Sequence, residues 1–185
     1  MTTSPTDPSP RQRALTEAVV DIERHVSSLG WDSPVLVFSL VRTAAALAVN
    51  PALAGELPEG AEESARLDPE HLLSIEQDGL PQADTLEELL AQLGWPEEVD
   101  GAAIVVERIV VPPEAEADMP RDPDAAVAYL EAHPDRQDVR IVAGVLRSGE
   151  SWCALRSRNH DTDDAVGGSP DAVPGLVEAL RATFS

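Results

Sequence analysis

Two apolar segments separated by a short turn constrain the fold of this 185-residue chain more than any other feature. Residues 138–147 and 152–158 flank Ser148-Gly149-Glu150-Ser151, an arrangement typical of a β-hairpin. A third segment, residues 101–111, is dense in Val and Ile and ends at Pro112, so it also predicts a strand. Because strands joined by a hairpin are antiparallel, we expect a mostly antiparallel sheet.

Helical patterns surround these strands, beginning with a predicted N-terminal pair of helices. Ser9 and Pro10 are favourable at the start of a helix, and apolar residues recur every three or four positions as far as residue 29. Residues 33–49 are apolar nearly all round, which predicts a second helix at the centre of the fold.

The rest of the chain alternates between short elements and polar loops. A short strand is expected over residues 71–77, and helices are expected over residues 84–93, over residues 122–133 and near the C-terminus. About four strands with helices packed on one face of the sheet is the simplest arrangement, which predicts an α+β fold. Residues 1–9 are expected to be a disordered tail, and residues 10–185 a single α+β domain.

Charge and cysteine content argue against several classes of function. The net charge of −21 repels nucleic acids and anionic membrane surfaces, so neither is expected as a partner. The one cysteine, Cys153, has no disulfide partner within the chain, and the N-terminus lacks the apolar core of a secretory signal, so a cytoplasmic location is predicted. No motif indicates a metal site, a cofactor or a catalytic residue.

A cluster of arginines is the best candidate for a binding site. Residues 136–158 contain five arginines and two acids, in a chain with 13 basic residues and 34 acids. If residues 149 and 150 form a two-residue turn, one exposed face of the hairpin carries Arg147, Trp152, Arg156 and Arg158. Such a face is suited to a carboxylate or phosphate ligand. The favoured interpretation, however, is that these arginines form ordinary ion pairs with the surplus of acids.

Glu107 and Arg108 are neighbours on the predicted strand 101–111, so their side chains point to opposite faces of the sheet. In so apolar a strand, we expect one of them to be buried in a structural ion pair, which is favoured over a catalytic role for Glu107. Arg108 joins the four hairpin residues as a candidate for ligand or partner binding. Cys153 is expected to fill the core, and Trp31 is expected to be a packing anchor.

Short pieces spread along the chain carry a resemblance to a protein family. They include Gly30-Trp31-Asp32-Ser33-Pro34, Trp95-Pro96, Asp138-Val139-Arg140 and Gly144-Val145-Leu146-Arg147. On these pieces the chain resembles a small family of uncharacterised actinobacterial proteins, over nearly its whole length apart from the tail. The resemblance implies no activity. At the level of the fold, the chain is also similar to secretion-chaperone-like proteins, and a fold alone does not imply a function.

The sequence favours a non-enzymatic cytosolic binding or assembly protein, which docks a partner protein through the face that carries the Arg and Trp side chains. The first alternative is an enzyme or sensor for a small anionic metabolite at the same face, with Glu107 or a loop acid as proton carrier. The second alternative is a homodimeric holder protein similar to secretion chaperones. None of the three hypotheses requires a metal or a cofactor.

Overall fold

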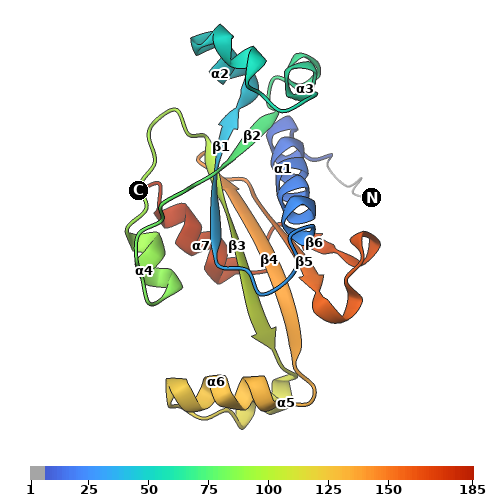
Figure 1. Ribbon diagram of the computed structural model, residues 1–185, viewed down its shortest axis with the longest axis vertical. Helices are drawn as coiled ribbons and strands as arrows, with labels where there is room; N and C mark the ends of the chain where they lie inside the picture. The colour runs from blue at the N-terminus through green and yellow to red at the C-terminus, as the bar shows by residue number, and fades with distance from the viewer. Residues whose placement is uncertain (1–6) are drawn as a thin grey trace, which may run out of the picture.

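Six antiparallel strands form one sheet in the computed structural model, which describes residues 7–185 (Figure 1). The strands are β1 (Leu36–Arg42), β2 (Leu72–Glu76), β3 (Gly101–Val110), β4 (Gln137–Leu146), β5 (Ser151–Ser157) and β6 (Gly167–Ser169). Their order across the sheet is β2-β1-β3-β4-β5-β6. The α+β class and the antiparallel sheet are confirmed, although we expected about four strands. Residues 1–6 of the predicted tail lie outside the described residues.

The longest helix, α1 (Pro10–Ser27), begins where the sequence predicts. The Ser9 side-chain oxygen accepts a hydrogen bond from the Gln12 backbone N–H and caps this helix. The other helices are α2 (Thr43–Val49), α3 (Ala61–Leu67), α4 (Leu86–Ala91), α5 (Pro113–Ala117), α6 (Pro123–Ala132) and α7 (Pro174–Ala182). In the described part of the chain, no helix combines the length and the apolarity needed to cross a membrane.

The predicted central helix over residues 33–49 is wrong. Its first half is strand β1, which lies between β2 and β3, and only its second half is a helix, α2. Four consecutive residues of β1, from Val37 to Leu40, are buried, so the strand shows no alternation between apolar and polar residues. A strand buried on both faces has the same continuous apolar pattern as a buried helix. The N-terminal helical pair is therefore reduced to α1 alone.

Helices cover both faces of the sheet, and not one face as predicted. α1 packs on one face and lies so close to β4 that a Cβ added at Gly144 would be 2.6 Å from Val19 Cγ2. Helices α4 and α7 cover the opposite face, where they pack with a second group of buried residues that includes Ile104, Ala143 and Cys153. The sheet thus separates two hydrophobic cores, one beneath α1 and one beneath α4 and α7.

The turn between β4 and β5 contains three residues, 147–149, and is one residue longer than predicted. Its last residue, Gly149, adopts a φ of +113°, which favours glycine. The longer turn changes the register, so Trp152 lies opposite Gly144 and not opposite Arg147. The predicted division of this hairpin into an exposed face and a core face is therefore wrong, because helices cover both of its faces.

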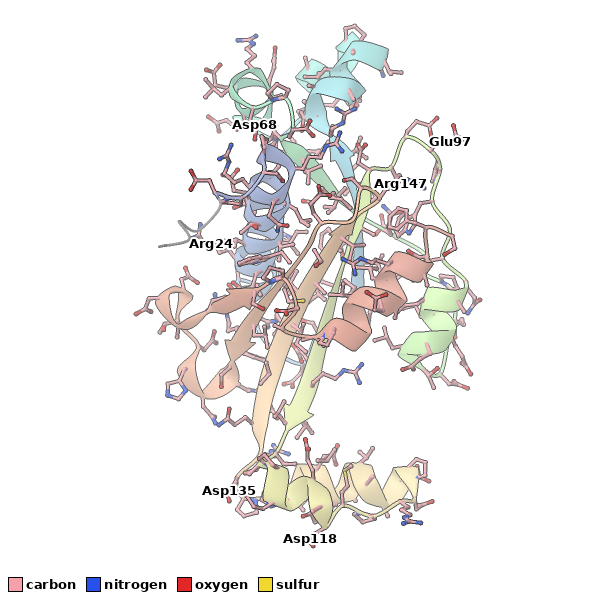
Figure 2. All side chains as sticks on the ribbon, turned by 180° about the vertical axis from the view of Figure 1, so that it is seen from behind. Arg24, Asp68, Glu97, Asp118, Asp135 and Arg147 are labelled. Carbon is pink, nitrogen blue, oxygen red and sulfur yellow. The ribbon has the colours of Figure 1, made fainter. Side chains whose placement is uncertain are left out.

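β3 and β4 extend beyond the rest of the sheet and form a two-stranded arm. β1 pairs with β3 only as far as Val105, so residues 106–110 pair with β4 alone. The arm carries α5 and α6 at its tip, away from α1, α4 and α7 (Figure 1). Asp118 and Asp135 lie in this tip, seen from behind in Figure 2. We refer to residues 113–136 as the α5–α6 lobe.

Candidate functional site

The four residues predicted to share a binding face, and the fifth candidate, Arg108, are separated by the fold. Trp152 and Arg156 lie on the side of the sheet that α1 covers, and Arg158 follows directly after β5 on the same side. Arg147 lies in the hairpin turn and contacts the segment before β3. Arg108 lies on the arm, beside a groove on the α7 side. The predicted continuous face does not form.

Arg156 is buried beside α1, and its guanidinium contacts three carboxylates. Both oxygens of Glu23, itself 1% exposed, accept hydrogen bonds from it, with Nη2 to Oε2 at 3.0 Å. Asp161 accepts from Nη1 at 3.0 Å, and Asp163 accepts from Nη2 at 2.6 Å. These hydrogen bonds, above all those to Glu23, raise the pKa of Arg156 further above its ordinary value. The guanidinium is therefore charged and fully engaged within the chain.

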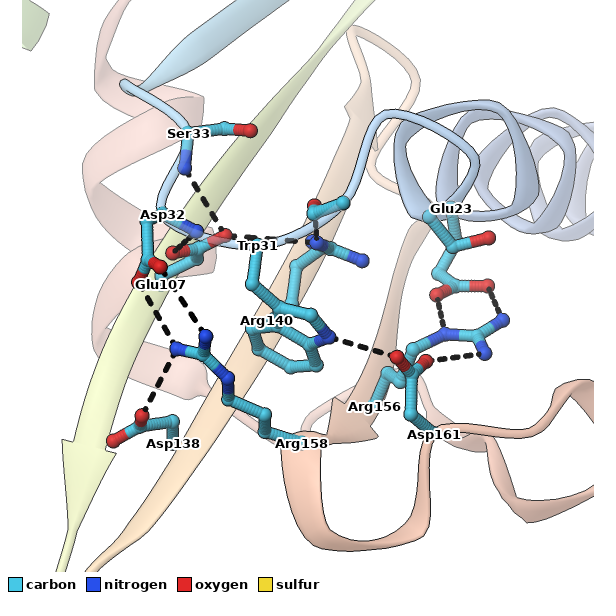
Figure 3. A network of polar contacts seen from close by, with 12 residues as sticks. Glu23, Trp31, Asp32, Ser33, Glu107, Asp138, Arg140, Arg156, Arg158 and Asp161 are labelled. Carbon is cyan, nitrogen blue, oxygen red and sulfur yellow. Dashed lines mark hydrogen bonds and ion pairs between the residues drawn. The ribbon is translucent and has the colours of Figure 1, made fainter.

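The loop after α1, residues 28–35, crosses the same face and places Trp31 against two guanidinium groups (Figure 3). The Cζ atoms of Arg140 and Arg158 lie 4.4 and 5.6 Å from the centre of the Trp31 ring, within the range of cation–π attraction. The Trp31 indole N–H donates to Asp161 Oδ2 at 2.9 Å, which lowers the pKa of Asp161 below its usual range. Trp31 thus anchors the loop to the sheet.

Arg140 lies beneath Trp31 and is completely buried. Its Nη2 donates to the Gly30 carbonyl and lies 3.5 Å from Glu107 Oε1, while Nε and Nη1 have no hydrogen-bond partner among the described residues. The Glu107 carboxylate also accepts from the backbone N–H groups of Asp32 and Ser33, at 2.9 and 3.4 Å (Figure 3). Glu107 therefore holds the loop in place. The predicted structural ion pair of this strand is present, but its Glu107 side chain is only partly buried, at 20% exposure.

Arg158 is more exposed than Arg156, but it is also paired. It donates to both oxygens of Asp32, at 3.0 and 3.2 Å, and to Asp138 at 3.4 Å. A polar cavity of about 320 Å³ beside this pair is lined by three arginines, Arg108, Arg136 and Arg158, and by four acids, Asp32, Glu107, Glu131 and Asp138. Because the acids outnumber the arginines, this cavity has no excess of positive charge with which to attract an anion.

Arg147 fastens the hairpin turn to the segment that precedes β3. Its Nε donates to the Val99 carbonyl at 2.7 Å, and its Nη2 donates to the Trp95 and Pro96 carbonyls at 3.2 and 2.8 Å. Its Cζ lies 4.7 Å from the centre of the Phe184 ring. The guanidinium is thus used to join parts of the fold.

A groove of about 640 Å³ opens on the α7 side of the arm, between the strands and helices α4 and α7. Its volume falls within the range of about 300–1,000 Å³ that is typical of ligand pockets. The lining is mainly apolar, with Val110, Val139, Ile141 and Leu155 from the strands and Leu86, Leu90, Val173 and Leu176 from the helical side. The sequence alone did not identify this groove, because it joins residues that lie far apart along the chain.

Arg108 is the basic residue of this groove, and Glu87 is its acid. The Arg108 side chain is exposed and forms no hydrogen bond or ion pair with any residue that the structure describes. It also borders the polar cavity on the other side of the arm. Of the five predicted residues, Arg108 therefore has the guanidinium that is most available to another molecule.

Cys153 lies in the core beneath α7 with no exposed surface, as expected of a core residue. Burial raises the pKa of its thiol, so the reactive thiolate is disfavoured. Within residues 7–185, no three His, Cys, Asp or Glu side chains are grouped in a way that could hold a metal ion. The described residues thus offer neither a reactive thiol nor a metal site.

Comparisons with known proteins give one match. A family model described as PPA1309-like protein matches residues 15–185. No curated protein and no solved structure matches the chain. The family match spans the domain from α1 to the C-terminus, which agrees with a resemblance over nearly the whole chain, and the actinobacterial source stays a prediction.

Proposed function

The chain belongs to the PPA1309-like protein family, and we propose that it is a non-enzymatic binding or assembly protein whose docking surface is the groove on the α7 side of the arm. The observation that carries this proposal is a mainly apolar groove of about 640 Å³ with the unpaired guanidinium of Arg108 at its rim. The proposed docking surface therefore differs from the hairpin face that the sequence suggested, and lies on the opposite side of the sheet.

The groove suits an apolar segment of a partner protein that carries one acidic side chain. Its apolar walls favour a ligand that removes them from water, since burial of apolar surface contributes about 25 cal/mol per Å². The guanidinium of Arg108 can then receive a carboxylate in a charge-assisted hydrogen bond. Apolar contact supplies affinity, and the ion pair fixes the orientation of the segment.

Charge favours this partner over a free anionic metabolite. The net charge of −21 repels small anions at long range, so an anion without an apolar body has little to offset the repulsion. Glu107, the proton carrier of the enzyme hypothesis, accepts two backbone hydrogen bonds and faces the buried Arg140. A carboxylate held in this way is poorly suited to proton transfer with a ligand.

The proposal is tested with anilinonaphthalene sulfonate, a fluorescent probe that joins an apolar body to one anionic group. We expect wild type to bind it, and Arg108→Glu to weaken binding about tenfold, because the cation at the rim becomes an anion. The matched control is Arg121→Glu, which reverses another exposed arginine that does not line the groove. Equal binding by Arg108→Glu and Arg121→Glu would overturn the proposed surface.

A second variant fills the groove without touching its charge. Gly175 lines the groove, and a Cβ at this position would meet no atom within 4 Å, so Gly175→Leu is compatible with the fold. We expect Gly175→Leu to reduce probe binding while the midpoint of thermal unfolding is maintained. Undiminished binding in this variant would place the probe elsewhere on the molecule and contradict the proposal.

A further inference from the structure

We infer that the segment received by the groove is helix α6 of a second copy of this chain, so that two copies form a dimer in which each arm clasps the other. This inference rests on the proposed function, and it names the partner. It follows from the exposure of α6, from the position of α6 relative to the groove, and from their complementary charges.

Helix α6 is apolar in sequence but lacks a buried face. Seven of its ten residues are Ala, Val, Tyr or Leu, yet none of its residues is buried. Val127 is 53% exposed on the side of the helix that also presents Asp124 and Ala128 to solvent. A surface helix ordinarily buries its apolar stripe, so an apolar helix without buried residues indicates a surface that another molecule covers.

The groove and α6 lie on the same side of the arm. In Figure 1, α6 extends crosswise from the tip of the arm, to the side on which α4 and α7 lie farther up the molecule, and Figure 2 shows the same arrangement from behind. Val110, which lines the groove, is the last residue of β3 before the chain enters the α5–α6 lobe. A two-fold axis beside the arm can therefore place each α6 in the groove of the other copy.

Local charge complementarity between Arg108 and Asp124 supports a second copy as the occupant, although the net charge of −21 on each chain opposes association at long range. Arg108 at the groove rim has no carboxylate partner in residues 7–185, and Asp124 has no basic partner there. Asp124 lies three residues before Val127, so both side chains lie on one face of α6. When Val127 enters the groove, Asp124 of the same helix comes within reach of Arg108 of the other copy. The two-fold symmetry makes this contact twice.

Sedimentation velocity on the full chain tests the dimer. We expect wild type to be dimeric at about 100 µM, and Val127→Glu to be monomeric, because it places a charge in an apolar groove. Arg108→Asp and Asp124→Arg are each expected to weaken the dimer about tenfold. The double variant Arg108→Asp/Asp124→Arg restores the opposite charges and is expected to recover most of this loss. The matched control is Val49→Glu at the far end of the sheet, where Val49 is 85% exposed.

The outcomes separate the inference from the proposed function. A wild type that stays monomeric at about 100 µM, or a dimer that Val49→Glu disrupts and Val127→Glu does not, overturns the α6 interface. A double variant that dimerises no better than either single variant also overturns it. The probe titration at about 1 µM protein in the Val127→Glu background tests the groove without the dimer. If Arg108→Glu weakens probe binding in this monomeric background, the proposed function is supported even when wild type does not dimerise.

Discussion

Two arginines on the α1 side of the sheet, Arg140 and Arg156, carry their charges inside the protein. Removing a charge from water is costly unless carboxylates and hydrogen bonds replace the lost hydration. Arg156 has this replacement from Glu23 and two loop acids, whereas Arg140 has one carboxylate at 3.5 Å, one carbonyl and the Trp31 ring. The Glu23–Arg156 pair is therefore the stronger anchor of α1 to the sheet.

Replacement of Glu23 tests this anchor. Glu23→Gln removes the buried carboxylate and leaves the guanidinium of Arg156 with only its two loop acids. We expect a loss of about 3 kcal/mol in the free energy of unfolding, measured by urea denaturation at neutral pH. Asp163→Asn is the control, because the Asp163 side chain is 67% exposed and its removal is expected to cost less than about 1 kcal/mol. Similar losses in the two variants would refute a special role for the buried pair.

Asp161 gives a prediction about pH. The hydrogen bond from Trp31 lowers its pKa in the folded state, so its contribution to stability is present above its unfolded pKa and is lost as pH falls through the folded value. Because the side chain is 43% exposed, solvent screening limits this contribution to about 0.5 kcal/mol.

The measurement is the difference in unfolding free energy between wild type and Asp161→Asn. We expect wild type to be more stable near neutral pH. The difference is expected to shrink as the pH falls below the ordinary aspartate pKa of about 4 and then through the lowered pKa of folded Asp161. Urea titrations at several pH values give this difference directly. A difference that grows as the pH falls would show that the sign of the linkage is wrong.

The sequence favoured ion pairing for the arginine cluster, but it did not identify the partners. Glu23 and Arg156 are 133 residues apart, and Trp31 and Asp161 are 130 residues apart. Such contacts depend on the register of the hairpin and on the position of α1 over it. Local sequence patterns contain neither the hairpin register nor the position of α1. The sequence therefore placed Arg156 and Arg158 on an exposed face, whereas the structure shows both paired with acids of the chain.

At the scale of elements, the sequence located most strands and helices, and the errors have identifiable physical causes. β1 was taken for a helix because a strand covered on both faces has no alternation. β6 was missed because Gly167–Ser169 is a three-residue edge strand with two glycines, which resembles a loop. The position of Arg147 was wrong because a turn of three residues replaced the expected two. These errors concern the burial of a strand on both faces, the pairing of a short edge strand and the length of a turn.

The crossing of α1 over β4 gives a prediction at this scale. A Cβ at Gly144 would lie 2.6 Å from Val19 Cγ2 and 3.1 Å from Leu15 Cδ1, both on α1. Gly144→Ala is therefore expected to push α1 from the sheet and to lower the free energy of unfolding by about 1–3 kcal/mol. Gly94→Ala, where a Cβ meets nothing within 4 Å, is the matched control and should change stability by less than about 0.5 kcal/mol. Urea denaturation of both variants decides whether the contact is as tight as it appears in the structure.

At the scale of the whole molecule, the arm and its tip leave apolar surface uncovered, with Val110 45% and Val127 53% exposed. The core of the sheet is protected on both faces, but the arm has a groove on one side and an apolar helix at its tip. On the α1 side, Arg140, Arg156 and Arg158 form hydrogen bonds and ion pairs within the chain, and these contacts connect the hairpin to α1 and to the loop after α1. The groove thus remains mainly apolar, with Arg108 and Glu87 as its charged residues.

Salt dependence distinguishes an apolar interface between two copies from one that opposite charges hold together. Two chains of charge −21 repel each other, and added salt screens this repulsion because the Debye length falls from about 10 Å at 0.1 M to about 3 Å at 1 M. The apolar contact of α6 with the groove persists at high salt, so the dimer is expected to tighten as NaCl is raised, although each Arg108–Asp124 pair weakens slightly. Sedimentation velocity at several NaCl concentrations measures the change, with Val127→Glu as the control that should stay monomeric throughout. If wild type instead dissociates as salt is added, attraction between opposite charges holds the dimer together, and the apolar interface through α6 is wrong.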